Sequence, residues 1–201
     1  MKAAMVEEEE GPRLIVGLND IDVQVRQQEE IDRRLAEAQS RANIDGLTGV
    51  KNKHAYLEIE AQMDRQIDAR HQSPFAIVMF DVNNLKKIND TAGHHAGDQY
   101  LRDACKIICD IFKRSPVYRV GGDEFTVIAL NDDYENIENH LRKADKHNEE
   151  ALKTNGIVIA CGMAKYEDDE SVAAVFERAD QKMYQNKNEL KSRHDMTDEK
   201  E

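Results

Sequence analysis

The spacing of apolar residues divides the chain into a short N-terminal part and a longer patterned region. Residues 2–6 and 13–18 are β-prone runs on either side of an acidic turn, and this pattern predicts a β-hairpin. From about Asp22 to Ala42 the sequence is highly charged, and a sparse apolar series runs through it: Ile31, Leu35, Ala38 and Ala42. This series is a short heptad seam, typical of a coiled coil, although a solvated connector helix fits the same pattern. Asn19 and Asp20 offer an N-cap for the helix.

After Asn43 the sequence alternates between helical and strand-like patterns. Helices are predicted at 51–70, 97–113, 134–152 and 171–190, and strands at 75–80, 117–120, 125–130 and 157–165. From 75 to 165 the order is strand, helix, strand, strand, helix, strand. This is the order of a ferredoxin-like α+β sandwich, with helices on one side of a central antiparallel sheet. Residues 194–201 are polar, and we expect a disordered tail there.

Two adjacent carboxylates, Asp123 and Glu124, follow a pair of glycines between two of the predicted strands. A Gly-Gly pair in this position signals a tight hairpin, because glycine enters positive φ without steric cost. Taken alone, these residues fit an exposed, solvated turn equally well. The position of Asp81 favours a functional site instead. The apolar run 75–80 is typical of a buried central strand, and it ends abruptly at Asp81, next to the hairpin in the predicted fold.

Asp81 and the acidic hairpin predict a site for a hard cation. Mg²⁺ is usually held by one or two carboxylates, while substrate phosphates and water complete its octahedron. Successive strand residues point to opposite faces, so only one of the two hairpin acids should face Asp81 squarely. We expect Asp123 to be the ligand and Glu124 an auxiliary acid. The alternative is that Asp81 merely ends a strand.

The segment 82–98 is unusually polar for a connection between a strand and a helix. It does not have the ligand pattern of an EF-hand, and the chain has neither a Walker A loop nor a G-x-G-x-x-G fingerprint. Lys86 and Lys87 could meet phosphates. Asn89 and Asp98 could bind a base edge, and a carboxylate acceptor matches the N1–H and exocyclic amine of guanine. Helix caps and turns are the alternative explanation for these residues.

Composition narrows the class of protein further. A chain of 201 residues, 40% of them hydrophobic, allows one ordinary domain with a sizeable core plus extra segments. No apolar run is long enough to span a bilayer and residues 1–10 lack the apolar stretch of a signal peptide, so we expect a cytoplasmic piece without membrane contact. A formal charge of −12 argues against nucleic acid as a partner. Cys105 and Cys109 share a helical face with apolar residues, which favours buried core over a zinc site.

Four motifs, taken in order, resemble those of the GGDEF domain of diguanylate cyclases. They are Asp45-Gly46-Leu47-Thr48-Gly49 with Asn52-Lys53, then Phe80-Asp81 through Asn89-Asp90 and Gly93-His94 to Gly97-Asp98, then Gly121-Gly122-Asp123-Glu124-Phe125, and finally Ala179-Asp180 with Met183-Tyr184 and Lys187. The resemblance implies a catalytic domain with a nucleotidyl cyclase palm-like fold over 44–193. More weakly, residues 1–21 resemble the last strands of a PAS sensor, and 22–43 resemble the signalling helix that joins such a sensor to a cyclase.

The resemblance implies an enzyme that joins two GTP molecules into cyclic di-GMP with loss of two pyrophosphates. Each protomer of a homodimer would bring one GTP. Mg²⁺, or Mn²⁺ in its place, would be held by Asp81, Asp123 and the backbone carbonyl of Val82. Asp123, with Glu124 beside it, would activate the 3′-hydroxyl, and Asn89 and Asp98 would bind guanine. Lys86 would stabilise charge on the reacting phosphate. Lys187 and Lys191 would bind the terminal phosphates.

The chain departs from the family pattern in two places. Phe112-Lys113-Arg114-Ser115 stands where the family has the Arg-x-x-Asp set of its product-inhibition site, so feedback through that site is not expected. Leu190-Lys191-Ser192 replaces the usual Gly-Arg-Asn, and the point charge of Lys191 cannot bind phosphate bidentately, which weakens the expected affinity for GTP.

A catalytically silent module that binds GTP or transmits a signal is the alternative to an active cyclase. The complete set of expected site residues favours the enzyme. The fit of Asp98 to guanine argues against a relative that makes a mixed cyclic dinucleotide.

Overall fold

The structure is a computed structural model that describes residues 2–8, 11–17 and 21–198. It divides into two compact units between Ala42 and Asn43, next to the predicted end of the linker helix. None of the described helices is long and apolar enough to cross a membrane.

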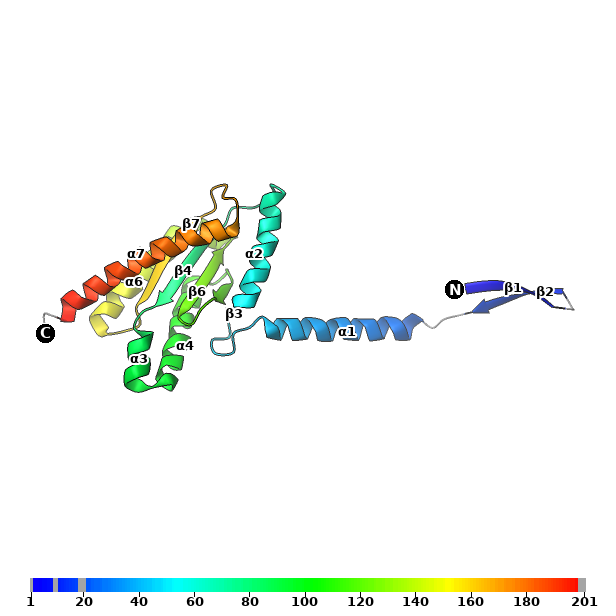
Figure 1. Ribbon diagram of the computed structural model, residues 1–201, viewed down its shortest axis with the longest axis horizontal. Coiled ribbons are helices and arrows are strands. Elements are labelled where there is room, and N and C mark those ends of the chain that lie inside the picture. The colour runs from blue at the N-terminus through cyan, green and yellow to red at the C-terminus, as the bar shows by residue number, and fades with distance from the viewer. Residues whose placement is uncertain (1, 9–10, 18–20, 199–201) are drawn as a thin grey trace. The chain divides into compact units, whose positions relative to one another are not determined.

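The first unit holds a hairpin and a helix, as the apolar pattern predicts (Figure 1). Strands β1 (Lys2–Glu8) and β2 (Gly11–Gly17) pair antiparallel. Helix α1 (Ile21–Ala42) follows, and Ile31, the first residue of the predicted heptad seam, is 57% exposed. The predicted N-cap at residues 19 and 20 lies outside the described residues. The origin of the hairpin in a PAS domain stays a prediction.

The second unit is built on a five-stranded sheet with the order β3-β5-β6-β4-β7. Its strands are β3 (Lys51–Asn52), β4 (Ala76–Val82), β5 (Val117–Arg119), β6 (Glu124–Ala129) and β7 (Ile159–Lys165). Strand β4 pairs antiparallel with β6 and β7 and is buried along its whole length, as its continuous apolar run predicts. The short β3 pairs parallel with β5, so the sheet is mixed rather than wholly antiparallel.

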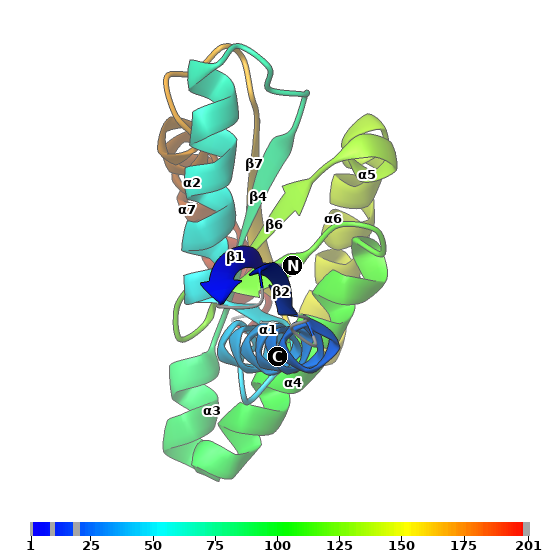
Figure 2. The same cartoon turned by 90° about the vertical axis from the view of Figure 1, so that its right-hand side faces the viewer.

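Helices flank both faces of this sheet. Helices α4 (His94–Ile111) and α6 (Ile137–Thr154) cover one face, while α2 (Lys53–Asp68) and α7 (Val172–Asp198) cover the other, as Figure 2 shows. Alternate side chains of β4 feed two separate cores: Val78 and Phe80 pack under α4 and α6, and Ile77 and Met79 under α2 and α7. The prediction of a sheet flanked by helices is confirmed. The expectation of helices on one side holds only for the two helices within the strand order, since α2 and α7 cover the second face.

Four elements differ from the sequence-based assignment. Residues 51 and 52, predicted as the start of a helix, form strand β3. The polar segment after Asp81 contains a helix, α3 (Leu85–Ala92), and a short α5 (Asn131–Glu135) precedes α6. Helix α3 is only eight residues long and none of its residues is buried, so its few apolar positions were taken for part of a polar loop. Helix α7 continues through residues 194–198, where the sequence had predicted a disordered tail.

Candidate active site

The predicted site residues gather where the central strands β4 and β6 meet the turn 121–123, which we call the acidic hairpin turn. Asp81 and Glu124 are direct partners in the antiparallel ladder, and residues directly opposite each other share one face of a sheet. That face is the one covered by α7. The sequence had suggested that Asp123, not Glu124, faces Asp81. The register differs because the turn includes Asp123 and β6 begins only at Glu124.

Asp123 stays close to β4 through its backbone. Its carbonyl oxygen accepts a hydrogen bond from the amide of Val82 at 2.9 Å. Both glycines of the turn lie outside the positive-φ region, contrary to the expected reason for a Gly-Gly pair. Gly121 serves a different need, because a Cβ at this position would lie 2.4 Å from Oε2 of Glu124. The missing side chain of Gly121 therefore makes room for the Glu124 carboxylate.

Asp81 is a buried carboxylate with one oxygen left without a protein partner. The residue is 4% exposed, and its Oδ2 accepts a hydrogen bond from Nζ of Lys187, on α7, at 2.5 Å. Its Oδ1 has no hydrogen-bond partner. Burial raises the pKa of Asp81, and the ion pair with Lys187 opposes that rise. A buried, unpaired carboxylate oxygen is costly, so this atom is suited to receive a cation or a donor.

Glu124 adds to the negative charge at this point. Burial raises the pKa of Glu124, and repulsion from Asp123 and Asp81 raises it further. Among the residues that the structure describes, no three His, Cys, Asp or Glu side chains form a set that could hold a metal by themselves. Two converging carboxylates and an unpaired buried oxygen nevertheless fit Mg²⁺, which takes few protein ligands when phosphates supply the others.

An open cavity of about 490 Å³ lies beside these carboxylates. It is lined by Val82, Asn83, Asn84, Leu85, Lys86, Lys87, Asp90, Thr91, Asp123, Lys187 and Lys191. Five of the predicted site residues, Val82, Lys86, Asp123, Lys187 and Lys191, are among them. Four of the lining residues are lysines, so the cavity is locally cationic in a chain whose formal charge is −12. Local positive charge of this kind attracts polyphosphates.

Asn89 and Asp98 lie outside this lining, on the two helices that meet at Gly93. The chain turns there with φ of 84°, a conformation that favours glycine. The side chain of Asn89 lies over Gly97, since a Cβ on Gly97 would be 1.9 Å from Oδ1 of Asn89. Asp98 is the next residue on α4 and is exposed. The structure thus brings the two predicted base-reading residues to neighbouring positions of α3 and α4.

Arg119 holds the acidic hairpin turn in place, and sequence reasoning missed it. Its Nε and Nη2 donate to the carbonyl oxygen of Gly122 at 3.2 and 2.7 Å. Its Nη1 lies 3.1 Å from Oδ1 of Asp45, which also accepts hydrogen bonds from the amide and hydroxyl of Thr48 at 2.9 and 2.6 Å. We call this set of contacts the Asp45–Arg119 brace. The available signal was a lone charged residue inside an apolar strand, just before the turn.

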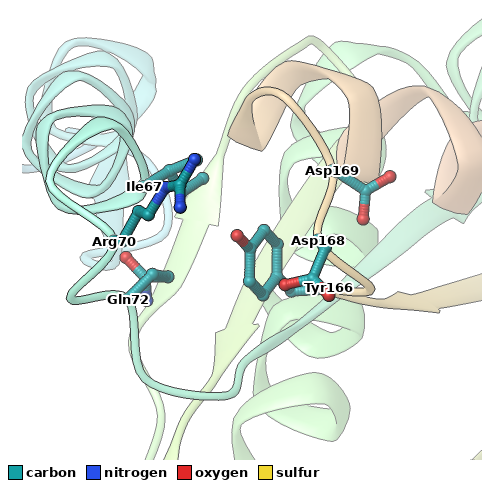
Figure 3. A pocket seen from close by; sticks show the side chains of 6 residues that line it. All are labelled: Ile67, Arg70, Gln72, Tyr166, Asp168 and Asp169. Atoms are coloured by element: carbon teal, nitrogen blue, oxygen red, sulfur yellow. The ribbon is translucent and has the colours of Figure 1, made fainter.

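A second cavity, of about 460 Å³, opens at the opposite end of the β4–β7 pair (Figure 3). It is lined by Ile67, Arg70, Gln72, Tyr166, Asp168 and Asp169. None of these is a predicted site residue. Asp169 is already engaged by Arg178, whose Nη2 lies 2.6 Å from its Oδ2. The carboxylates and lysines that suit a metal nucleotide are all at the other end of the sheet.

The fold and the site together define a class of protein: a mixed α/β domain with an acidic hairpin at the sheet end and a lysine-lined cavity suited to a nucleotide. Residues 42–193 match the family described as diguanylate cyclase, GGDEF domain, and the chain belongs to this family.

Curated relatives in this family carry names of two opposite kinds. The cyclic di-GMP phosphodiesterase PdeR of Escherichia coli is 38% identical over 91 residues, which are 45% of this chain and 13% of that protein. The diguanylate cyclase DgcS of Shewanella oneidensis is 28% identical over 155 residues, which are 75% of this chain and 51% of that protein. The chain thus spans about half or less of these relatives.

Among solved structures, the coiled coil and GGDEF domain of DgcB from Caulobacter crescentus, in complex with c-di-GMP, superposes with a TM-score of 0.67. The match covers 84% of this chain and 92% of that one at 23% identity, and it establishes the likeness of the fold.

Proposed function

We propose that the chain is a diguanylate cyclase that condenses two GTP molecules into cyclic di-GMP and two pyrophosphates. One observation carries the proposal: Asp81 is buried with an unpaired Oδ1, directly opposite Glu124 and beside a cavity lined by four lysines. Carboxylates without cations repel one another, and lysines without anions do likewise. A metal–triphosphate complex satisfies both groups at once.

The chain offers Asp81, Asp123 and the Val82 carbonyl to Mg²⁺, with Mn²⁺ as an alternative ion. When bound, the ion would neutralise charge on the phosphates of GTP. Lys187 is paired with Asp81 in the structure, at 2.5 Å. Lys187 and Lys191 both line the cavity and would bind the terminal phosphates, since Lys187 would no longer be needed to neutralise an Asp81 that holds the ion.

The side chains around the cavity act mainly by positioning and by charge. In-line phosphoryl transfer needs an aligned nucleophile and neutralised phosphates more than covalent help. Lys86, at the start of α3, lines the cavity where it can meet the reacting phosphate. Asp123 accepts the proton of the attacking 3′-hydroxyl. Glu124, whose pKa is raised by burial and by its acidic neighbours, is a stronger base than an exposed glutamate and assists it.

Base selection falls on the pair of helices α3 and α4. Asp98 accepts hydrogen bonds from N1–H and the exocyclic amine of guanine, and adenine presents no such pair of donors. Asn89, whose side chain lies over Gly97, supplies an amide next to it.

A second copy of the chain completes the reaction. The lysine-lined cavity beside the acidic hairpin turn provides for one GTP. Joining two GTP molecules needs two such sites facing each other, so we propose a homodimer related by a twofold axis. Each protomer then presents its bound 3′-hydroxyl to the phosphate held by its partner.

Incubation of the purified chain with GTP and Mg²⁺, followed by chromatographic separation of the nucleotides, tests the proposal. Cyclic di-GMP and pyrophosphate are the expected products. Asp123→Asn should reduce their formation by at least about a hundredfold, because it removes a metal ligand and the proton acceptor. Asp103→Asn, an exposed change on α4, serves as the matched control and should leave the rate unchanged.

Two results would contradict the proposed cyclase activity or its metal site. Binding of GTP without any cyclic di-GMP, at protein concentrations where dimers are demonstrated, would mean a silent signalling module. An undiminished rate in Asp123→Asn would place the metal site elsewhere.

A further inference from the structure

Asn83 is a buried amide side chain in the wall of the lysine-lined cavity, and the chemistry proposed above gives it no role. It follows β4 directly, is 5% exposed and lines the cavity together with Asp123. Its Oδ1 is buried and has no hydrogen-bond partner among the residues that the structure describes. Leaving a buried acceptor unpaired is costly. A ligand that brings a donor to this oxygen therefore supplies a hydrogen bond that the protein lacks.

Two ordinary structural roles do not account for the Asn83 side chain. An asparagine at the start of a helix commonly caps it by accepting a hydrogen bond from an amide of the first turn. The N-cap residue of α3 is Asn84, and Oδ1 of Asn83 accepts no such bond. Asparagine is also frequent where the backbone needs a positive φ, but here that residue is again Asn84, with φ of 65°. The Asn83 amide is thus buried without a structural task.

Backbone hydrogen bonds fix Asn83 close to Asp123. The amide of Asn83 donates to the carbonyl of Val158 at 3.0 Å, and the amide of Val82 donates to the carbonyl of Asp123 at 2.9 Å. Asn83 therefore adjoins a residue that is bonded to the acidic hairpin turn. Its side chain and that of Asp123 present two acceptors to the same cavity. Acceptors held in place before binding lose little freedom when a ligand arrives, which favours selective recognition.

GTP carries few donors, and this narrows the partner of the Asn83 oxygen. Ionised phosphates and a bound Mg²⁺ have no hydrogen to donate. In the function proposed above, the N–H groups of guanine meet Asp98 and Asn89, which lie outside the lining of the cavity, and the 3′-hydroxyl gives its proton to Asp123. The 2′-hydroxyl remains. It is on the neighbouring carbon of the ribose, so an acceptor next to Asp123 is suitably placed for it.

We propose that Asn83 recognises the ribose: its Oδ1 accepts a hydrogen bond from the 2′-hydroxyl of GTP and so selects a ribonucleotide over a deoxyribonucleotide. The same bond holds the sugar with its 3′-hydroxyl at Asp123. The identity of the nucleotide rests on the proposed cyclase function. The role of Asn83 is to bind and position, since no bond forms or breaks at this residue.

The size of the effect follows from the burial of the acceptor. A site built to hydrogen-bond a hydroxyl group discriminates strongly against an analogue that lacks it, because the buried acceptor is then left without a partner. 2′-Deoxy-GTP keeps the base, the triphosphate and the 3′-hydroxyl of GTP. Its affinity should nevertheless be about tenfold or more lower.

The first test compares the binding of two nucleotides that differ only in the 2′-hydroxyl. GTP and 2′-deoxy-GTP, each with a methylene bridge between the α- and β-phosphates that prevents condensation, are titrated into the wild-type chain with Mg²⁺ by calorimetry. The ribonucleotide should bind about tenfold or more tightly. Equal affinities would overturn the role of Asn83. Binding of neither nucleotide would instead overturn the proposed cyclase function, and the ribose site with it.

Two variants of Asn83 then locate the selectivity. Asn83→Leu keeps the size of the side chain but removes the acceptor, so its affinities for the two nucleotides should become equal. Asn83→Asp keeps an acceptor and should keep the preference for the ribonucleotide. Asn139→Leu, the same replacement at an exposed position of α6, should behave as the wild type. A preference that survives in Asn83→Leu, or that is lost in Asn83→Asp, would place the ribose contact elsewhere.

Turnover gives a further readout, which a merely structural residue would not change. 2′-Deoxy-GTP retains the attacking 3′-hydroxyl, so it can still be condensed. In the wild type its kcat/KM should be about tenfold or more below that of GTP, and in Asn83→Leu the two values should be equal. A loss of the same size for both nucleotides in Asn83→Leu, as expected for a metal ligand or a folding defect, would contradict the proposal. The wild-type comparison stays decisive even if this variant folds poorly.

Discussion

The charged forms of Asp81 and Glu124 are destabilised by burial at this site. Asp81 and Glu124 face each other on the sheet, and burial raises the pKa of both. Of the two, Asp81 is paired with a cation, Lys187, and that contact uses one of its two oxygens. Glu124 has no such ion pair, and its cost to the folded state should therefore be measurable in the protein without metal.

Glu124→Gln should stabilise the folded protein at neutral pH in the absence of metal. Because the folded pKa lies above the ordinary value of 4.5, the native state binds this proton more tightly than the unfolded chain does. The cost of Glu124 is thus absent below about pH 4.5, grows as pH rises through the folded pKa, and is complete above it. Thermal unfolding at pH 8 should show a rise of about 2–4 °C for each kcal/mol relieved, shrinking to nothing at pH 4.

An exposed glutamate on α7 provides the comparison. Glu177→Gln removes a charge without relieving burial, so its melting temperature should match the wild type at both pH values. A Glu124→Gln protein that is no more stable at pH 8, or that gains stability only in acid, would contradict the electrostatic picture of the site.

At the scale of elements, the helix pair α3 and α4 positions the base-reading residues through one close contact. Gly97→Ala would place a Cβ 1.9 Å from Oδ1 of Asn89. The obstructing atom is the far end of a flexible side chain, so Asn89 should swing away while both helices stay folded. Preference for GTP over ATP should fall about tenfold or more, because the base loses a fixed polar partner. Competition kinetics with the two nucleotides measures this, and Gln99→Ala on the same helix should leave the preference unchanged.

The acidic hairpin turn is held by Arg119, which also binds Asp45, a residue far away in the sequence. The guanidinium of Arg119 binds the Gly122 carbonyl and Asp45 at the same time. In Arg119→Lys, the single ammonium group cannot bind both. A displaced turn misplaces Asp123, so kcat should fall about ten- to a hundredfold. The free energy of unfolding should fall by about 1.5–3 kcal/mol for the lost charge-assisted bonds. Steady-state kinetics and urea unfolding test this, with Arg142→Lys, exposed on α6, as the control; equal kcat in both variants would refute the role of the brace.

These elements also show what a sequence can and cannot reveal. Strand β4 and the placement of Asp81 at its end were predictable, because a continuous apolar run that stops at an acid has few other meanings. The register that places Glu124 opposite Asp81 depends on the length of the turn. The Gly-Gly pair alone predicts a shorter turn than the structure has, because the turn also includes Asp123. Arg119 contacts Asp45 across 74 positions, and no local pattern encodes such a contact. Helix α3 was missed because its residues are not buried.

At the scale of the whole molecule, the second unit is structurally self-sufficient but chemically incomplete. Two separate cores fill both sides of its sheet, and the lysine-lined cavity beside the acidic hairpin turn provides for one nucleotide. A reaction between two nucleotides then makes the rate depend on how often two copies meet. Helix α1, with its exposed Ile31 and the heptad spacing of its sequence, is the element that we expect to control this encounter.

Ile31→Ala should weaken pairing without changing the chemistry of a formed pair. Burial of one such side chain in an interface contributes about 1.5–3 kcal/mol, so the dissociation constant should rise at least about tenfold. For the wild type, turnover per protomer should rise with protein concentration and reach a plateau. The variant should reach the same plateau at higher concentration, and sedimentation velocity should show fewer dimers. Glu29→Ala, on the opposite side of α1 by its spacing, should leave both curves in place. A lower plateau in Ile31→Ala would mean that α1 acts within the pair rather than in its formation, and a rate independent of concentration down to monomeric protein would exclude the twofold mechanism altogether.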